Sequence, residues 1–263
     1  MITFNYLGKL GQLGNQMFQY ASTKGIASHL GYDFMIPDHD EIFDDGIGNK
    51  LHIELDVPFT IDCKRGMINS TDIREGGFEF DEKLFNECPD NCNLFGFFQT
   101  EKYFKHISDE IRKDFTFKKP FVDECKEIVE SVFDDPIALH IRRGDFLINS
   151  GNHHNLPLEW YEKALRKFEV RRDVIIFTDD PEWATEQELF KPDRFIISRG
   201  NSSYIDLYLM TQCSDFIIAN SSFSWWGAWL ANTGKVIAPK VWFGPNNSHL
   251  NTKDLYPRHW ETI

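Results

Sequence analysis

Two arginines follow a predicted buried strand, at the place where a parallel sheet presents its ligand-binding residues. The sequence HIRRGD at residues 140–145 ends an apolar strand over residues 137–141 and contains Arg142, Arg143 and Asp145. Guanidinium groups stay charged and bind phosphate through paired hydrogen bonds. We therefore interpret this segment as a candidate phosphate site; a salt-bridged loop is the alternative.

An acidic pair, Asp179 and Asp180, follows Thr178 at the end of the next predicted strand, residues 174–177. Carboxylates at such strand ends accept hydrogen bonds from a ribose or a base in nucleotide-binding folds. An aspartate before Pro181 is also typical of a helix N-cap. Both interpretations stay open, and one aspartate could serve each purpose.

A serine-rich turn follows a third predicted strand, residues 216–219. The sequence NSSFSWWGAW begins at Asn220 and places hydroxyls at Ser221, Ser222 and Ser224. The first turn of a helix has unpaired N–H groups and a positive dipole end, which together favour an anion. We expect phosphate contact from these serines. The alternative, an N-cap followed by a buried aromatic helix, is favoured for Trp225, Trp226 and Trp229.

A glycine-rich turn near the N-terminus contains Gly8, Gly11 and Gly14 before Asn15. It matches neither the dinucleotide fingerprint nor the P-loop, so it supports neither class of protein. Glycines let a backbone approach a ligand closely, and an asparagine beside a helix N-terminus offers both a donor and an acceptor. The turn is a second candidate ligand site, with a purely structural turn as the alternative.

The elements that must position these residues are an alternation of strands and helices. The first 40 residues read as strand, glycine turn, helix (16–30) and strand (33–36), whereas residues 38–90 are loop-rich with a few edge strands. A buried strand (94–99) and helices (101–115 and 120–133) follow. From residue 136 the pattern is regular and predicts a parallel sheet with crossover helices on both faces, which binds ligands at the carboxyl ends of its strands. The expected strands are 137–141, 174–177, 195–197, 216–219 and 236–238, and the expected helices are 158–170, 181–190, 204–213 and 223–232.

Composition narrows the class of protein. The chain has 263 residues and a formal charge of −13, which argues against a nucleic-acid coat and a polybasic membrane binder. Its five cysteines lack the spacing of a zinc site or a disulfide framework and predict structural thiols in a reducing compartment. Without a leader peptide or a long apolar segment, we expect a cytoplasmic protein, or one at the membrane periphery where glycan acceptors are assembled.

Four segments together resemble the α-1,2-fucosyltransferases of glycosyltransferase family 11. They are GQLGNQMFQYA at residues 11–21, HIRRGD at 140–145, TDD at 178–180 and NSSFSWWGAWL at 220–230. They occur in the family's order and span most of the chain, although residues 38–90 contribute nothing. The chain lacks the membrane anchor of Golgi members, so it resembles a bacterial-type version.

The resemblance implies a GT-B-like α/β architecture, with two Rossmann-like domains facing across a cleft. Residues 1–133 would form the acceptor-side domain and residues 134–263 the domain that binds GDP-β-L-fucose. The implied activity is that of a galactoside 2-α-L-fucosyltransferase, which transfers fucose with inversion to the 2-hydroxyl of a terminal galactose. GDP-fucose and a galactose-terminated oligosaccharide are the expected partners, and neither a cofactor nor a metal is expected.

The resemblance also implies roles for individual residues. Arg142 would stabilise the departing diphosphate, and Asn15, flanked by Gly14 and Gln16, would reach the donor from the opposite domain. His140 and Asp179 would face the guanine and the ribose. The residues that hold phosphate and frame the base would be Ser221, Ser222, Phe223 and Ser224.

The catalytic base remains open at this level. Asp145 is the first candidate, His153 and His154 are the second, and a loose transition state would need no strong base. Asp145 is equally explained as a structural partner of Arg143. Two other functions also remain: a fucosyltransferase of α-1,6 or peptide O-linkage, and a non-catalytic glycan-binding protein that uses its seven tryptophans as sugar platforms.

Overall fold

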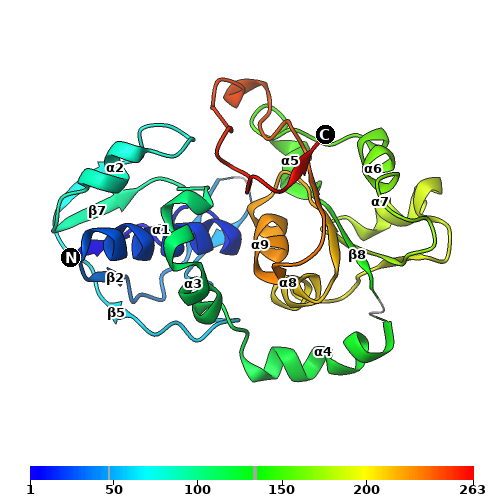
Figure 1. Ribbon diagram of the computed structural model, residues 1–263, viewed down its shortest axis with the longest axis horizontal. Coiled ribbons are helices and arrows are strands. Elements are labelled where there is room, and N and C mark those ends of the chain that lie inside the picture. The colour runs from blue at the N-terminus through cyan, green and yellow to red at the C-terminus, as the bar shows by residue number, and fades with distance from the viewer. Residues whose placement is uncertain (47, 133–134) are drawn as a thin grey trace. The chain divides into compact units, whose positions relative to one another are not determined.

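The computed structural model describes residues 1–46, 48–132 and 135–263 (Figure 1). The chain divides into two compact units, residues 1–116 with 250–258, and residues 117–249 with 259–263. Each unit contains a parallel sheet, as the predicted α/β class requires. The domain boundary expected between residues 133 and 134, and the expected end of a helix at Phe133, lie outside the described residues.

The first unit is built on a five-stranded parallel sheet with the order β5-β2-β1-β7-β6. Two of its strands, β5 and β6, come from the loop-rich stretch and occupy the two edges, as expected of edge strands. An antiparallel pair, β3 and β4, comes from the same stretch. The bounds are β1 Ile2–Thr3, β2 Phe34–Ile36, β3 Phe43–Asp44, β4 Lys50–Leu51, β5 Lys64–Arg65, β6 Thr71–Arg74 and β7 Cys92–Phe95.

The helix predicted over residues 101–115 is three short helical pieces. Thr100 caps the first piece, as its side chain accepts a hydrogen bond from the Lys102 N–H. The backbone leaves helical geometry at Phe104, whose ring is fully buried beside Phe18 of α1. This packing depends on Gly25, because a Cβ there would lie 2.9 Å from Cα of Phe104. Tertiary packing therefore overrides helix propensity here. The helices of this unit are α1 Leu13–Leu30, α2 Glu82–Glu87, η1 Glu101–Tyr103, η2 Lys105–Ile107 and α3 Ser108–Asp114.

The second unit contains a six-stranded parallel sheet with the order β10-β9-β8-β11-β12-β13. In order along the chain this is 3-2-1-4-5-6, the arrangement of dinucleotide-binding sheets. The chain reverses its direction of winding between β8 and β11, and ligands bind at such a switch point. The strands are β8 Ile137–Ile141, β9 Val174–Thr178, β10 Phe195–Ile197, β11 Asp215–Ile217, β12 Val236–Ala238 and β13 Glu261–Thr262. All but β13 were expected from the sequence.

Helices cover both faces of this sheet, because successive strand residues point in opposite directions. Leu139 of β8 packs in the core cluster with Tyr161 and Ala164 of α6, whereas His140 faces α9. Figure 1 shows α8 and α9 on one side of β8 and α6 and α7 on the other. The helices are α4 Lys119–Val132, α5 Gly144–Ile148, α6 Leu158–Leu165, α7 Pro181–Glu186, η3 Glu188–Phe190, α8 Ser203–Thr211, α9 Ser222–Ala231 and η4 Pro245–Asn247.

The tryptophans of α9 are packing residues, as their helical spacing predicted. Trp225 and Trp226 are fully buried and Trp229 is 4% exposed. Their rings contact one another, and Trp225 also contacts Trp260 at a centroid distance of 5.4 Å. In the part of the chain that the structure describes, no helix is both long enough and apolar enough to cross a membrane.

Candidate functional site

Three polar segments meet at one edge of the second sheet. Strand β8 lies between β9 and β11, with His140 opposite Phe177 and Leu139 opposite Ile217. The residues that follow these strands therefore emerge side by side, as the sequence predicted. We call this group the strand-end cluster; it consists of His140, Arg142, Arg143, Asp145, Asp179 and residues 220–224.

Arg142 lies between two carboxylates in the strand-end cluster. Its Nη2 is 2.7 Å from Oδ1 of Asp145, and its Nη1 is 2.9 Å from Oδ2 of Asp179. Each of the three side chains is at most 24% exposed, which limits screening by water. The cation is therefore fixed at the switch point by two anions with which an incoming phosphate would compete.

Arg143 has a different set of partners. Its Nε donates to Oδ2 of Asp180 at 3.0 Å, and its guanidinium lies 3.9 Å from the ring centre of Trp183. Asp145 therefore pairs with Arg142 and not with Arg143, which corrects the pairing considered from the sequence. Arg143 is held by a carboxylate and an aromatic face, as arginine side chains commonly are.

The two adjacent aspartates have separate contacts. Asp180 is the N-cap of α7, since its Oδ1 accepts from the Trp183 N–H at 3.1 Å, which confirms the capping interpretation for this residue. Asp179 contacts the arginines, because its Oδ1 accepts from the Arg143 N–H at 2.8 Å while its Oδ2 pairs with Arg142. Of these two adjacent aspartates, it is Asp179 that pairs with Arg142.

His140 is a buried, neutral imidazole. It is 5% exposed, and its Nδ1 lies 2.9 Å from Oγ of Ser224. Its ring also lies beside Phe223, with the two centroids 5.5 Å apart. Burial, and secondarily the charge of Arg142, lowers the pKa of His140 to about 3. His140 can therefore exchange hydrogen bonds at neutral pH but carries no charge.

The N-terminus of α9 completes the strand-end cluster. Ser221 occupies the N-cap position, where its carbonyl accepts from the Trp225 N–H at 3.1 Å. Ser222 and Phe223 form the half-buried first turn, and Ser224 is fully buried against His140. The first turn of a ten-residue helix is an anion-binding position.

Asn220 has a positioning role that the sequence did not reveal. It is buried, and its Nδ2 donates to the carbonyls of His154 and Trp242 at 2.9 and 2.8 Å. These contacts fix the loop that carries the second pair of candidate bases. The sequence showed only an asparagine at a strand end, and such a residue is equally compatible with binding a ligand.

His153 and Arg142 both contact the ring of Phe146. Its ring stacks on Phe146 at a centroid distance of 4.0 Å, and the guanidinium of Arg142 lies 5.4 Å from the same Phe146 ring. Burial lowers the pKa of both His153 and His154. Both are therefore uncharged at neutral pH, as a base that accepts a proton must be.

The glycine turn belongs to the first unit. There Oδ1 of Asn15 accepts from Nε2 of Gln99 at 2.6 Å, which orients the amide at the start of α1. Gln16 is fully buried; its Nε2 donates to the His52 carbonyl and its Oε1 accepts from the Glu54 N–H, each at 2.8 Å. This arrangement favours a positioning role for Gln16. Gly14 lies in the first turn of α1 and is buried.

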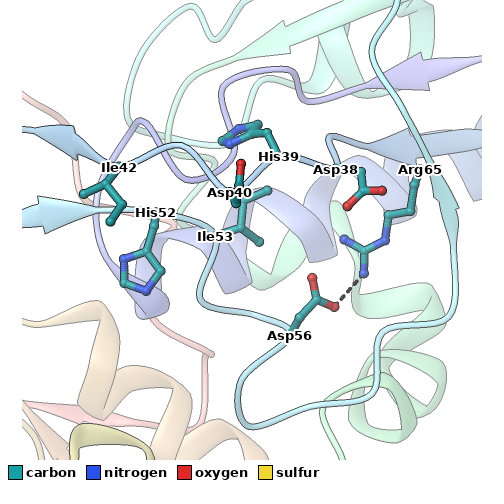
Figure 2. Close-up of a pocket in the computed structure, with 8 residues that line it drawn as sticks. All are labelled: Asp38, His39, Asp40, Ile42, His52, Ile53, Asp56 and Arg65. Carbon is teal, nitrogen blue, oxygen red and sulfur yellow. Dashed lines mark hydrogen bonds and ion pairs between the residues drawn. The ribbon is translucent and has the colours of Figure 1, made fainter.

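A pocket in the first unit was not found by sequence reasoning. It has a volume of about 320 Å³ and is lined by residues of segments 38–42 and 52–56 together with Arg65 (Figure 2). The only signal in the sequence was the acidic character of the stretch, which has no periodicity. We call it the acidic pocket.

The two groups of polar residues differ in what they can bind. The strand-end cluster offers two guanidinium groups and a helix N-terminus, which suit an anion, whereas the acidic pocket is rich in carboxylates. Among residues 1–46, 48–132 and 135–263, no three His, Cys, Asp or Glu side chains are grouped as metal ligands.

Comparisons with known proteins agree with the sequence resemblance. The chain is 30% identical to the O-antigen biosynthesis glycosyltransferase WbnK of Escherichia coli, over 94% of this chain and 97% of that protein. It is 31% identical to an α-1,2-colitosyltransferase of the same species, over 96% of each. It is 25% identical to galactoside α-(1,2)-fucosyltransferase 1 of Alouatta caraya, over 84% of this chain and 63% of that protein.

Solved structures support the predicted fold. The crystal structure of NodZ α-1,6-fucosyltransferase soaked with GDP-fucose aligns with a TM-score of 0.56 at 13% identity, covering 95% of this chain and 97% of that one. The GT-B-like class expected from the sequence is thereby confirmed. The family model described as glycosyl transferase family 11 matches residues 3–263. The chain therefore belongs to glycosyl transferase family 11.

Proposed function

We propose that this protein transfers L-fucose from GDP-β-L-fucose to the 2-hydroxyl of a terminal galactose, with inversion and without a metal. Family membership and two relatives named as α-1,2-transferases support this linkage. The observation that carries the proposal is Arg142, a cation held at the switch point of a 3-2-1-4-5-6 sheet beside a helix N-terminus.

The proposed reaction places charge where these groups lie. As the bond between the fucose C1 and the GDP oxygen breaks, negative charge grows on the diphosphate. Arg142 and the first turn of α9 would stabilise this charge, so their contribution would be larger in the transition state than in the ground state. His140 and Asp179 would contact the guanosine, and Asn15 would contact the donor.

The acceptor step needs a destination for one proton. The galactose O2 forms a bond to the fucose C1 on the face opposite the leaving GDP, and its proton would pass to the carboxylate of Asp145. Asp145 pairs with Arg142 at 2.7 Å, and as the base its carboxylate would have to reach the acceptor face of the sugar, opposite the diphosphate. His153 is the second candidate base.

A second candidate function differs only in the donor. The relative at 31% identity is named as an α-1,2-colitosyltransferase, so colitosyl transfer by this chain is also supported. Colitose is a 3-deoxy analogue of fucose, so the two donors differ by one hydroxyl. The structures of α-1,6- and peptide O-fucosyltransferases share the fold at 12–13% identity and carry no argument for linkage.

Incubation with lactose and either GDP-fucose or GDP-colitose tests the proposal. Linkage analysis of the product by NMR should show fucose on the galactose O2, with no loss of rate in EDTA. Product with GDP-colitose alone would establish the second candidate. Fucose on any other oxygen, or EDTA-sensitive transfer, would contradict the proposal; calorimetric absence of GDP binding would favour a glycan-binding protein.

A further inference from the structure

The acidic pocket has walls from three segments of the first unit. Segments 38–42 and 52–56 line it together with Arg65, which is the last residue of β5. Its volume of about 320 Å³ lies at the small end of the ~300–1,000 Å³ range of ligand sites. The proposed function assigns no role to it.

The glycine turn fixes one wall of the acidic pocket. Gly8 has a φ of +80°, and a Cβ there would lie 2.8 Å from the backbone N of Ile53. Gln16 fastens the same segment through the His52 carbonyl and the Glu54 N–H. The turn that carries Asn15 is therefore packed directly against the pocket wall. A ligand in this pocket would lie next to the motif expected to contact the donor.

The polar groups of the acidic pocket are arranged as partners for hydroxyls. Figure 2 shows the carboxylates of Asp38 and Asp56 beside the guanidinium of Arg65, and Nη2 of Arg65 lies 2.6 Å from Oδ1 of Asp56. Both ring nitrogens of His39 are buried and have no hydrogen-bond partner among the described residues. Because these nitrogens are closed off without any ligand, the hydroxyl acceptors that the pocket offers are the exposed carboxylates of Asp38 and Asp40.

The pocket is also partly apolar and carries net negative charge. Ile53 and the 68%-exposed Ile42 provide the apolar surface. The lining contains three carboxylates, of Asp38, Asp40 and Asp56, and one guanidinium, of Arg65. Apolar C–H surface combined with hydroxyl acceptors suits a sugar ring, and the excess of carboxylates opposes an anionic ligand.

We propose that the acidic pocket binds a neutral, hydroxyl-rich sugar of the acceptor glycan and discriminates against acidic glycans. The inference rests on the proposed function for the identity of the ligand as an acceptor. Asp38 and Asp40 accept hydrogen bonds from sugar hydroxyls, and Ile42 and Ile53 contact the apolar face of the ring.

Two open-chain galactosides of equal size provide the test. Lactitol is neutral, whereas lactobionate carries a carboxylate in place of one CH₂OH group. Binding of each to the full-length protein is measured by saturation-transfer NMR without any donor. Lactitol should bind more tightly than lactobionate by about 10-fold, because like charges repel in a partly solvated site. Substitution Asp40→Asn should reduce this ratio by about 3- to 10-fold.

Asp62→Asn is the matched control, since Asp62 is exposed in the same unit and does not line the pocket. It should leave the ratio unchanged. Equal binding of the two galactosides by the wild type, no binding of either, or an unchanged ratio in both Asp40→Asn and Asp38→Asn would overturn the inference.

Transfer assays keep this inference separate from the proposed function. If fucose is transferred, Asp40→Asn should raise KM for lactitol by about 3- to 10-fold and leave KM for GDP-fucose unchanged. If no galactoside is fucosylated, yet lactitol binding and its charge discrimination depend on Asp40, the proposed function fails while the neutral sugar site stands. If fucose is transferred but Asp40→Asn leaves KM for lactitol unchanged, the sugar site is overturned while the proposed function stands.

Discussion

Nη2 of Arg142 lies 2.7 Å from Oδ1 of Asp145, so the expected diphosphate-binding cation and the first candidate base form one ion pair. Asp179 contacts the other side of the same guanidinium. The two carboxylates hold the guanidinium in place, and an incoming diphosphate would compete with them for its N–H groups. The ion pair also means that the roles of Arg142 and Asp145 must be tested separately.

Substitution Arg142→Lys should lower kcat/KM for transfer by about 10²-fold or more. A lysine keeps the charge but lacks the planar fork that contacts both carboxylates and a phosphate. Steady-state kinetics with GDP-fucose and lactose measure the effect. Arg171→Lys, at a side chain that is 86% exposed, is the control and should behave as wild type. Near-wild-type turnover in Arg142→Lys would remove the assigned role.

Substitution Asp145→Asn should lower kcat by about 10²-fold or more while GDP affinity is retained or increased. The variant loses the proton acceptor, and it also releases Arg142 from one competing anion. Calorimetry with GDP and single-turnover kinetics separate the two effects. Loss of GDP affinity together with turnover would instead assign Asp145 to the support of the site, and His153→Gln would then be the next variant to measure.

Substitution Ser224→Ala should lower the free energy of unfolding by about 1–3 kcal/mol. It leaves Nδ1 of the buried His140 without its partner at 2.9 Å. The pKa of His140 is lowered to about 3, so at pH 8 the imidazole is neutral in both folded and unfolded states and titration does not contribute. Urea unfolding at that pH gives the value. Ser203→Ala, on an exposed first turn, should change it by less than about 0.5 kcal/mol.

Glu75 should make the protein less stable as the pH rises from about 5 to 8. Burial raises the pKa of Glu75 to about 7 from an ordinary 4.5, although its Oε2 accepts from the N–H groups of Phe97 and Phe98. The folded state then binds more protons than the unfolded state between these two values, so the free energy of unfolding falls with pH.

Glu75→Gln should therefore stabilise the protein more at pH 8 than at pH 5, by about 2 kcal/mol, since its amide oxygen can still accept from the same N–H groups. Thermal or urea unfolding at the two pH values measures the difference. The exposed Glu87 supplies the control variant Glu87→Gln. An equal effect of Glu75→Gln at both pH values would show that Glu75 titrates normally.

Sequence reasoning located the strand-end cluster because its signal is local. An apolar run predicts a buried strand, and the residues immediately after β8, β9 and β11 are read directly from the chain. The alternation of strands and helices then places these ends at one edge of a parallel sheet. The N-cap at Asp180 is likewise set by neighbours in the sequence, and the helical spacing of Trp225 and Trp226 predicted that they pack in the core.

The contacts around Arg142 could not be predicted in the same way. Asp145 pairs with Arg142 and not with Arg143 because of how the chain turns into α5. The contact between Arg142 and Asp179 joins residues that follow two different strands. The break at Phe104 has the same origin, because close packing against Gly25 of α1 outweighs the local helix signal.

The sequence by itself determined the family, the alternating α/β pattern and the side chains available for chemistry. Only the tertiary structure revealed the acidic pocket, lined by residues 38–42, 52–56 and 65, in which Gln16 and the Arg65–Asp56 ion pair hold the wall at residues 52–56. The reason is physical: periodicity reports which side of an element is buried, whereas a pocket between irregular segments exists only through contacts between distant parts of the chain.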